Sequence, residues 1–564
     1  MIKSKINKLI KSFSKYNIDG YIVPKNDEFF SEQVFNDRLK LISNFSGSAG
    51  LAVLLRKKNY LFVDGRYTIQ AKKQSGKLFK IIEIHKSLPH KILKNVTLGF
   101  DPKLFTKSLL YFYFGKNINL KAINKNLVNF KTSSKLKKKY LFYSLPRKVA
   151  GKSHKDKISE VSKILEKNNS DYLFVSAPEN IAWLLNIRGA DTPFSPIPNC
   201  NLILSKNKKI YLIADIKKLS NLLKEKKISA QQIVNPNDFQ KLVNHLPGKK
   251  IIIDSKTCSI FNENIISLKL KIIQRKDPCY FLKSLKNTKE INYMKKAHIE
   301  DGVALTKFIY WIKNTKKKIT EISAEKKLEQ FRKKNKNFLY PSFNTIAGTG
   351  SNGAIIHYRA TKETNKNIKK RDIFLCDSGG QYKYGTTDVT RTICFTKQSA
   401  LIRKIFTLVL KGHIAIATCD INKINTGAKM DIRARQFLKK EGLNYAHGTG
   451  HGVGFFSNVH EGPQSISKFN NINLKPGMIL SNEPGYYKEG KFGIRIENLV
   501  FIKKIKKKIF FENLTLVPID KDLINYNMLN KKEKEYLFQY HLTVYSKISK
   551  FLNDKEKKWL VKNL

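Results

Sequence analysis

Short apolar runs alternate with helix-like segments through the first half of the chain. "IDGYIVP" (18–24) has the composition of a buried strand, and "GSAGLAVLL" (47–55) and "NYLFVDGRY" (59–67) follow it as two more. A second series of strands and helices begins near Pro146 and ends near Pro278. Strands that alternate with helices are typical of α/β domains. We therefore expect two α/β units of similar outline, although no residue-level repeat relates them.

The second half has a different pattern. A long helical stretch, about 288–313, precedes two β-rich pieces, and the tail after Asp520 is helical again. A chain of 564 residues also favours several domains. The predicted fold class is therefore α/β, or α+β when the last part is included. The predicted domains are 1–146, 147–280, 281–503 and 504–564.

The charge of the chain raises the question of nucleic-acid binding. Lys and Arg number 107 against 44 Asp and Glu, a formal net charge of +63. Most of the excess is lysine, whereas arginine is the better residue for phosphate forks and base edges. The lysines are also spread along the chain in short runs such as "KKIKKKIF" (503–510). We therefore predict a solvated basic surface and no nucleic-acid partner; a steep salt dependence of DNA binding would support the alternative.

Cysteine usage and the N-terminus indicate the compartment. The six cysteines are widely spaced, without a C-x-x-C pair, which favours reduced thiols in a cytosolic protein. Residues 2–13 carry apolar side chains at helical spacing, and we predict an amphipathic helix packed on its domain rather than a transit peptide. No run of about 18 apolar residues occurs. We therefore expect a cytoplasmic protein without a membrane partner.

Two aspartates in "FLCDSGGQYKYGTTDVTRTI" are the first candidate site residues. Asp377 and Asp388 each adjoin a β-like run, and a Gly-Gly turn region lies between them. A hairpin would place both carboxylates on one face of neighbouring strands. Two adjacent like charges are unfavourable unless a positive charge lies between them. A divalent cation is the simplest such charge.

Two glutamates add to this set. The alternation of "GIRIENLVF" places Glu497 inside an apolar strand, on the same face as Arg495. A structural salt bridge between these two residues is the alternative interpretation. Glu483, in "SNEPGYY", follows an apolar run and precedes a Pro-Gly turn. Taken alone, Glu483 would be an ordinary turn residue.

The stretch "HGTGHGVGFFSNVHEGP" (447–463) supplies imidazoles in a glycine-rich loop. One imidazole and four carboxylates form a mostly hard-oxygen site, which favours Mn²⁺, with Co²⁺, Fe²⁺ or Zn²⁺ as alternatives. Four carboxylate charges balance two divalent ions. Two ions can share a bridging water and ionise it to a hydroxide nucleophile. The sequence therefore predicts a dinuclear hydrolytic centre.

These motifs resemble those of the pita-bread metallopeptidases, peptidase family M24, which include methionine aminopeptidase, prolidase and aminopeptidase P. The resemblance is carried by "HGTGHGVG", "NEPGYY", "GIRIEN" and the aspartate pair. "DGYIVPKNDEFFSE…FSGSAG…VDGRY", "ENIAWLLNIRGAD" and "NGAIIHYRA" resemble segments of aminopeptidase P, and "YHLTVYSKISKFLNDKEKKWL" resembles the C-terminal extension of its cytosolic three-domain form. This resemblance implies two creatinase-like N-terminal domains, a pita-bread catalytic domain and a C-terminal extension.

The resemblance also implies a role for each candidate residue. Two Mn²⁺ ions would be held by five ligands: Asp377, Asp388, His451, Glu483 and Glu497. Asp388 and Glu497 would bridge the ions, and Glu483 would also shuttle a proton.

Five further residues would surround the ions and the substrate. His357 would contact the substrate near the scissile bond, and His460 would hydrogen-bond the developing oxyanion. His447 would shape the prolyl pocket. Arg495 would orient Glu497 from behind, and Tyr487 would orient groups near the site.

The implied activity is hydrolysis of the bond between an N-terminal residue and a following proline, by a Xaa-Pro aminopeptidase. Proline has no N–H and a fixed φ, so this bond needs a dedicated pocket. The implied partners are proline-containing peptides and a second copy of the chain in a homodimer. A prolidase, which cleaves Xaa-Pro dipeptides, and a pita-bread binding protein without catalysis are the alternatives.

Overall fold

The computed structural model describes residues 2–129 and 141–563. The chain divides into two compact units, Met1–Leu282 and Lys283–Leu564. Each unit is described by itself below. The first predicted domain, 1–146, includes residues 130–140, which lie outside the described residues.

The first unit contains two six-stranded sheets with the same topology. The first sheet has the order β4-β3-β2-β1-β5-β6, and the second has the order β12-β11-β10-β8-β13-β14. The consecutive strands β1, β2 and β3 of the first sheet pair antiparallel, as do β8, β10 and β11 of the second. The three other pairings of each sheet are parallel. The expected likeness of the two α/β units is therefore confirmed at the level of strand order and direction.

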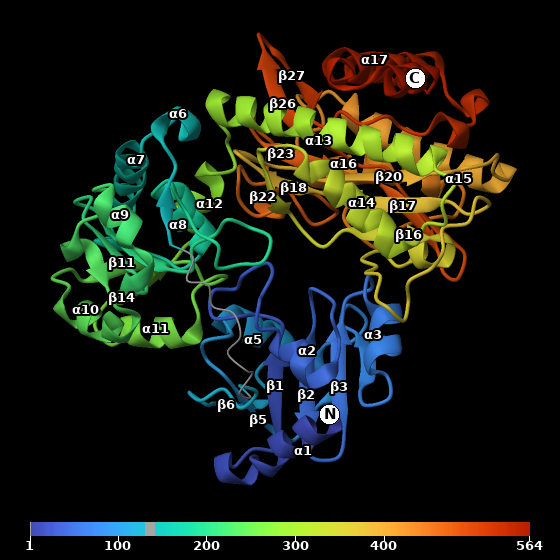
Figure 1. The fold of residues 1–564 in the computed structure, drawn as a ribbon. Coiled ribbons are helices and arrows are strands. Elements are labelled where there is room, and N and C mark those ends of the chain that lie inside the picture. Colours follow the sequence, from blue (N-terminus) through green and yellow to red (C-terminus); the bar gives the residue numbers. More distant parts are fainter. Residues whose placement is uncertain (1, 130–140, 564) are drawn as a thin grey trace. The chain divides into compact units, whose positions relative to one another are not determined.

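Figure 1 shows the first sheet with β1, β2 and β3 side by side. Its strands are β1 (Gly20–Pro24), β2 (Leu51–Leu55), β3 (Asn59–Val63), β4 (Lys80–Glu83), β5 (Thr97–Phe100) and β6 (Asn119–Ala122). Its helices are α1 (Ile2–Lys11), α2 (Arg38–Ser43), α3 (Thr68–Ser75), α4 (Pro89–Ile92) and α5 (Lys107–Phe114). Helix α1 buries Ile6 and Leu9 in the core, as predicted for a packed amphipathic helix.

The second sheet has a core on each face. Its strands are β8 (Tyr172–Val175), β10 (Asn201–Ser205), β11 (Ile210–Ile213), β12 (Ile233–Val234), β13 (Lys250–Ile253) and β14 (Lys271–Gln274). Its helices are α6 (Arg147–Ala150), α7 (His154–Lys167), α8 (Pro178–Leu184), α9 (Ser220–Lys224), α10 (Phe239–His245), α11 (Ile260–Ser267) and α12 (Pro278–Leu282). Strands β7 (Tyr143–Ser144) and β9 (Ile187–Arg188) pair separately.

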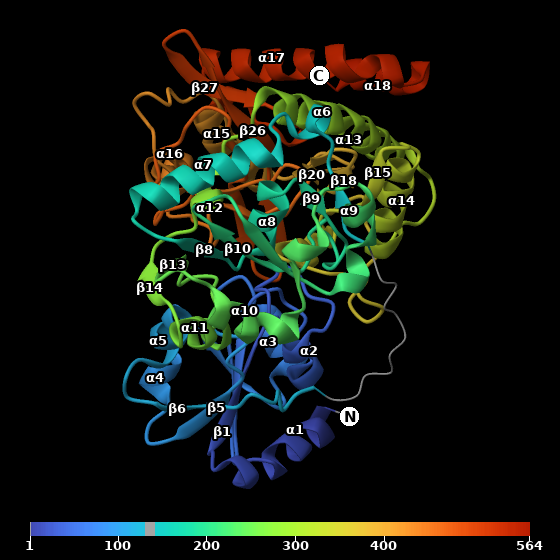
Figure 2. The same cartoon turned by 90° about the vertical axis from the view of Figure 1, so that its left-hand side faces the viewer.

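The second unit surrounds short antiparallel sheets with long helices. Its helices are α13 (Thr288–Asn314), α14 (Glu321–Lys333), α15 (Ala400–Ala417), α16 (Gly427–Lys439), α17 (Lys531–Ile548) and α18 (Asp554–Lys562). Helix α13 begins at a capping box formed by Asn287 and Glu290, which satisfies free N–H groups of its first turn. Figure 2 shows α17 and α18 lying along α13, and both helices contact it.

The strands of the second unit carry the candidate site. They are β15 (Phe338–Pro341), β16 (Ile346–Thr349), β17 (Phe374–Ser378), β18 (Gly380–Tyr382), β19 (Gly385–Thr386), β20 (Val389–Ile393), β21 (Gly450–Gly452), β22 (Glu461–Ile466), β23 (Ile479–Asn482), β24 (Gly485–Lys488), β25 (Phe492–Arg495), β26 (Asn498–Ile505) and β27 (Lys508–Asn513). They form the sheets β15-β18-β19, β16-β17-β20, β22-β21-β23-β26-β27 and β24-β25. Every residue of β17 and of β20 is buried, which fits their position against α13 and α14.

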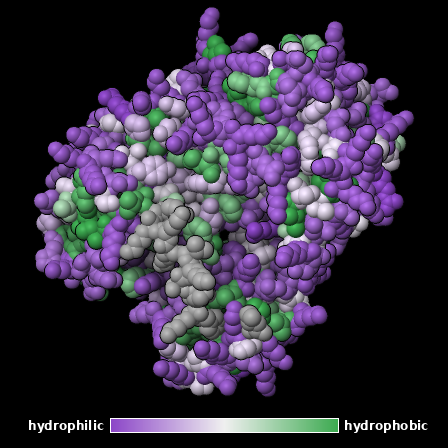
Figure 3. Space-filling model, in the orientation of Figure 1, coloured by the Kyte–Doolittle hydropathy of each residue, from purple (hydrophilic) through white to green (hydrophobic). Residues whose placement is uncertain are grey.

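The side chains that face solvent are mostly hydrophilic. Hydrophilic side chains cover most of the face drawn in Figure 3, and apolar ones form small separate patches. Among the described residues, no helix is both long and apolar enough to cross a membrane. All six cysteines lie in the described part of the chain; each is buried, and none forms a disulfide.

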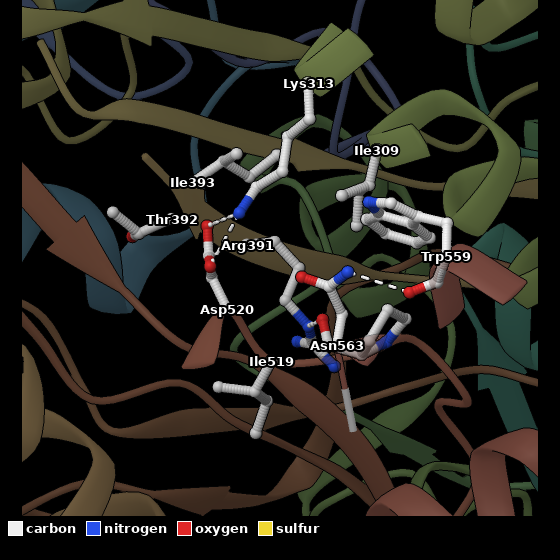
Figure 4. A pocket seen from close by; sticks show the side chains of 10 residues that line it. Ile309, Lys313, Arg391, Thr392, Ile393, Ile519, Asp520, Trp559 and Asn563 are labelled. Atoms are coloured by element: carbon white, nitrogen blue, oxygen red, sulfur yellow. Dashed lines mark hydrogen bonds and ion pairs between the residues drawn. The ribbon is translucent and has the colours of Figure 1, made fainter. Parts of the chain in front are cut away.

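A buried ion pair joins α13 to the segment after β27. Lys313 Nζ lies 2.7 Å from Asp520, which also accepts from the backbone N–H groups of Cys394 at 2.9 Å and of Asp522 at 3.3 Å. Figure 4 shows this pair beside a cavity lined by Arg391 and Trp559. The cavity measures about 10 Å³, which is room for a single water molecule. It is therefore too small to be a ligand site.

We predict that Asp520→Ala lowers the free energy of unfolding by about 3 kcal/mol, because it leaves a buried ammonium group without its main partner. Asp522→Ala is the matched control. Asp522 lies 3.3 Å from the same ammonium group, but its side chain is 53% exposed. Its loss is expected to change stability by less than about 1 kcal/mol. Urea unfolding followed by tryptophan fluorescence compares the two variants, and equal effects would contradict the prediction.

Candidate metal centre

Strands β17 and β20 bring the two predicted aspartates together. The strands are antiparallel neighbours, with Asp377 opposite Thr390 and Ser378 opposite Val389. Asp388 directly precedes β20, and both aspartates are buried. The connection is longer than a simple hairpin, because β18 and β19 form a turn of their own that pairs with β15. The predicted placement of two carboxylates on neighbouring strands is nevertheless what the structure shows.

The remaining ligand candidates come from the sheet β22-β21-β23-β26-β27. Glu497 lies between β25 and β26, Glu483 follows β23, and His451 is the middle residue of β21. One ligand atom each from Asp388, His451 and Glu497 lies within 4.8 Å of the others. His451 Nε2 is 3.5 Å from Asp388 Oδ2 and 3.4 Å from Glu483 Oε1. The side chains therefore converge on one small volume.

The histidine stretch is only partly a loop, which corrects the expectation from its glycine content. His451 is held in strand β21, because glycine at 450 allows that strand to pack closely on β23. A Cβ atom at Gly450 would lie 1.9 Å from the carbonyl oxygen of Ser481. His451 Nδ1 lies 2.9 Å from the carbonyl of Gly452 and donates to it. Nε2 therefore faces the carboxylates and is the ring nitrogen available to a metal ion.

The electrostatics of the cluster call for added positive charge. Burial, with the charges of Asp377 and Glu483, raises the pKa of Asp388 well above its usual value. Burial and the same neighbours, together with Asp388, raise the pKa of Glu497 in the same way. Oδ1 of Asp377 and Oδ1 of Asp388 are buried without a hydrogen-bond partner. Buried oxygens without donors and mutually repelling carboxylates fit a pair of divalent cations.

Arg495 connects these carboxylates from one side. Its Nη2 lies 2.6 Å from Asp377 Oδ2, and its Nε donates to the hydroxyl of Thr390 at 3.0 Å. Thr390 in turn donates to Glu497 Oε2 at 2.7 Å. Arg495 thus forms its ion pair with Asp377 and reaches Glu497 through Thr390. The alternative interpretation of a direct Arg495–Glu497 structural pair does not describe these contacts.

The three other predicted histidines lie at different depths around the cluster. The ring of His460 is exposed, and its centroid is 4.2 Å from that of His451. His447 is half-buried, and its Nε2 is 2.9 Å from the hydroxyl of Tyr487. Tyr487 also accepts a hydrogen bond from Arg495 Nη1 at 2.6 Å, and burial raises the pKa of Tyr487 to about 12.

His357 is half-buried in the turn after the short 3₁₀ helix Gly350–Ala354. That helix packs directly on β25, where a Cβ at Gly493 would lie 1.8 Å from the carbonyl oxygen of Gly353. Tyr358, the next residue, belongs to an apolar cluster against which Tyr487 packs. The His357 segment is therefore held against the strand that carries Arg495.

Two residues of the site escaped the sequence analysis. Thr390 links Arg495 to Glu497, and the hydroxyl of Ser481 contacts both Glu483 Oε1 and the backbone N–H of His451, each at 2.9 Å. The only available signal was position: each lies two residues from a predicted ligand, on the same face of an extended segment.

A second group, Cys394, Asp520 and Asp522, also lies close enough to hold an ion. Lys313 Nζ lies 2.7 Å from Asp520 and 3.3 Å from Asp522, so a cation already neutralises these carboxylates. This group is accounted for by the ion pair of α13.

Comparison with known proteins agrees with this geometry. Residues 292–504 match the model of metallopeptidase family M24, and 508–564 match the C-terminal region of that peptidase family. Residues 5–130 and 135–290 each match a creatinase/prolidase N-terminal domain. The Xaa-Pro aminopeptidase 1 of Dictyostelium discoideum is 37% identical over 604 residues, covering 99% of this chain and 96% of that protein. The chain belongs to metallopeptidase family M24.

Other M24 relatives support the same assignment along the whole chain. A probable Xaa-Pro aminopeptidase P of Pyrenophora teres f. teres is 35% identical, covering 97% of this chain and 90% of that protein. The crystal structure of the Caenorhabditis elegans X-prolyl aminopeptidase, described as a cytosolic enzyme with a dinuclear active site, superimposes with a TM-score of 0.91. It is 27% identical and covers 100% of this chain and 99% of its own.

A prolidase structure of the family matches less of the chain. The prolidase of Thermococcus sibiricus is 26% identical and has a TM-score of 0.53 over 65% of this chain and 98% of its own. The predicted fold is therefore confirmed: creatinase-like N-terminal domains precede a pita-bread M24 domain.

Proposed function

We propose that this M24 chain is a metal-dependent aminopeptidase that hydrolyses the bond between an N-terminal residue and a following proline. The observation that carries the proposal is the convergence of Asp388, His451 and Glu497 within 4.8 Å. This cluster lies in a chain that matches Xaa-Pro aminopeptidases over nearly their full length. A binding protein without catalysis has no need for such a set of unpaired buried carboxylate oxygens.

We propose that two divalent ions would be held by Asp377, Asp388, His451, Glu483 and Glu497. The oxygen-rich ligand set favours Mn²⁺, with Co²⁺, Fe²⁺ or Zn²⁺ as substitutes. When bound, such a pair supplies a Lewis acid for the scissile carbonyl and lowers the pKa of a water molecule that acts as the nucleophile. Glu483, half-buried beside His451, is placed to accept the proton of that water and to pass it to the leaving nitrogen.

The histidines are proposed to act on the substrate. His460 is exposed, and its ring lies 4.2 Å from that of His451 between centroids, which supports a role as hydrogen-bond donor to the oxyanion that develops on the carbonyl. His357 contacts the substrate near the scissile bond. His447, fixed by Tyr487, forms a wall of the prolyl pocket. Arg495 keeps Asp377 and Glu497 in place during the reaction.

Location, oligomeric state and domain limits are proposed from the same features and the same family. We propose a cytoplasmic location, since all six cysteines are buried and none forms a disulfide, and a homodimer, as the family resemblance implies. We also propose the domain limits 1–146, 147–280, 281–503 and 504–564. Neither a nucleic acid nor a membrane is proposed as a partner.

A panel of short peptides tests the proposal. With Mn²⁺ present, the enzyme is expected to release arginine from Arg-Pro-Pro and to act at least about tenfold more slowly on Xaa-Pro dipeptides, because an aminopeptidase binds the chain beyond the proline. Peptides with alanine in place of the first proline are the control, and they should resist cleavage. Preference for the dipeptides would instead identify a prolidase, and cleavage of neither class would overturn the proposal.

A further inference from the structure

The segment that carries His447 is positioned from helix α16. Residues 440–449 connect this helix to strand β21, and 444–449 are the part that it contacts. Asp431 and Arg435 lie one turn apart on α16 and form an ion pair, with Arg435 Nε 2.8 Å from Asp431 Oδ2. Their side chains are 3% and 11% exposed, respectively, so this is not an ordinary solvated helix pair. It faces the 444–449 segment.

Arg435 donates hydrogen bonds to the backbone of the 444–449 segment. Its Nη2 donates to the carbonyl of His447 at 2.5 Å, and its Nη1 donates to the carbonyl of Tyr445 at 2.8 Å. Nη1 also lies 2.8 Å from Asn444 Oδ1, and the guanidinium carbon is 3.8 Å from the centre of the Tyr445 ring. A planar guanidinium makes several such bonds in fixed directions, which the single ammonium group of lysine cannot do.

Asp431 contacts the end of the same segment that is hydrogen-bonded to Glu483, a predicted metal ligand. Its Oδ1 accepts from the hydroxyl of Thr449 at 2.6 Å, and that hydroxyl is 2.5 Å from the hydroxyl of Tyr445. The carbonyl of Thr449 accepts from the backbone N–H of Glu483 at 2.8 Å. The ion pair on α16 therefore holds the segment 447–449 at both ends: Arg435 binds the carbonyl of His447, and Asp431 binds the hydroxyl of Thr449.

The hydrogen bonds of His447 assign its tautomer. Nδ1 lies 2.7 Å from the carbonyl of Gly448, so Nδ1 carries the proton and donates. Nε2 then accepts from Tyr487, whose hydroxyl in turn accepts from Arg495. Two hydrogen bonds therefore orient the ring, and both depend on the position of the 447–448 backbone, which Arg435 contacts.

We propose that Arg435, clamped by Asp431, is a positioning residue for substrate recognition: it holds the backbone of His447 so that the imidazole can meet the proline side of the scissile bond. This inference rests on the proposed function, because it takes His447 as a wall of the prolyl pocket. Asp431 and Arg435 act through His447 and touch neither the ions nor the reacting atoms.

Kinetics of Arg435→Lys test the inference. The KM for Arg-Pro-Pro is expected to rise about tenfold, with kcat within about twofold of the parent, because binding rather than chemistry is affected. The matched control is Arg433→Lys on the same helix, where the guanidinium donates to the carbonyl of Ala415 at 3.0 Å. This control should leave both constants unchanged. A purely structural role of Arg435 would lower the melting temperature and the active fraction without raising KM.

A double variant separates action through His447 from any other cause. Arg435→Lys added to His447→Ala is expected to raise KM no further than His447→Ala alone. An unchanged KM in Arg435→Lys, or effects that multiply in the double variant, would overturn the inference.

If the parent enzyme and Arg433→Lys cleave no Xaa-Pro peptide, it is the proposed function that fails. A crystal structure of Arg435→Lys then decides the positioning role alone. The His447 ring is expected to leave the Tyr487 hydroxyl, and an unmoved ring would overturn the inference.

Discussion

Asp388→Asn is expected to lower kcat for Arg-Pro-Pro by about a thousandfold, which is ~4 kcal/mol of transition-state stabilisation. The substitution keeps the shape of the side chain but removes a charge from the centre of the predicted ligand set. It also turns one ligand oxygen into an amide nitrogen, which binds Mn²⁺ poorly. Steady-state kinetics at saturating Mn²⁺ measure the effect.

The same variant should be at least as stable as the parent when both are free of metal. Burial and neighbouring carboxylates already raise the pKa of Asp388, so its charge is unfavourable without cations. We expect the metal-free variant to gain about 1 kcal/mol of unfolding free energy. Asp372→Asn is the control, since Asp372 lies just before β17 and its nearest ion-pair partner, Arg371, is 4.0 Å away. A loss of activity equal in both variants would contradict the assignment of Asp388.

Removal of divalent ions is expected to reduce activity at least about a hundredfold and to lower the melting temperature. The reason is that four carboxylates then face one another with only Arg495 as a nearby fixed cation among the contacts described above. Mn²⁺ should restore both properties, and metal analysis of the parent should find two ions per chain. Asp388→Asn should retain fewer ions under the same conditions.

The identity of the restoring ion is a separate outcome of that experiment. Co²⁺, Fe²⁺ and Zn²⁺ added singly show which ions the ligand set accepts. If exhaustively stripped protein kept its full activity, the metal mechanism would be wrong, whatever the peptide specificity.

Local patterns in the sequence predicted the parts of the centre that depend on one strand at a time. The apolar runs around Asp377 and Asp388 are buried strands, and the acidic residue within "GIRIENLVF" marks Glu497. The edge strands β6 and β14 were not predicted individually. Their residues are mostly exposed or half-buried, so they lack a continuous apolar run.

Contacts between distant segments could not be predicted in the same way. The sequence around Thr390 shows only a strand. Its role depends on hydrogen bonds with Glu497 and Arg495, which lie about a hundred positions away in the sequence. The strand conformation at His451 was likewise hidden, because glycines there favour a loop unless a neighbouring strand needs their small size. Arg435 gave no signal, since on α16 it has the sequence context of a solvated helix residue.

The two paired strands that hold Asp377 and Asp388 are made long before the segment that holds Glu483 and Glu497. More than a hundred residues separate the first of these carboxylates from the last. In the proposed ligand set, the site is incomplete until translation has passed Glu497. We therefore expect metal loading to follow synthesis of the whole catalytic unit, and the supply of metal to set how much of the finished chain becomes active.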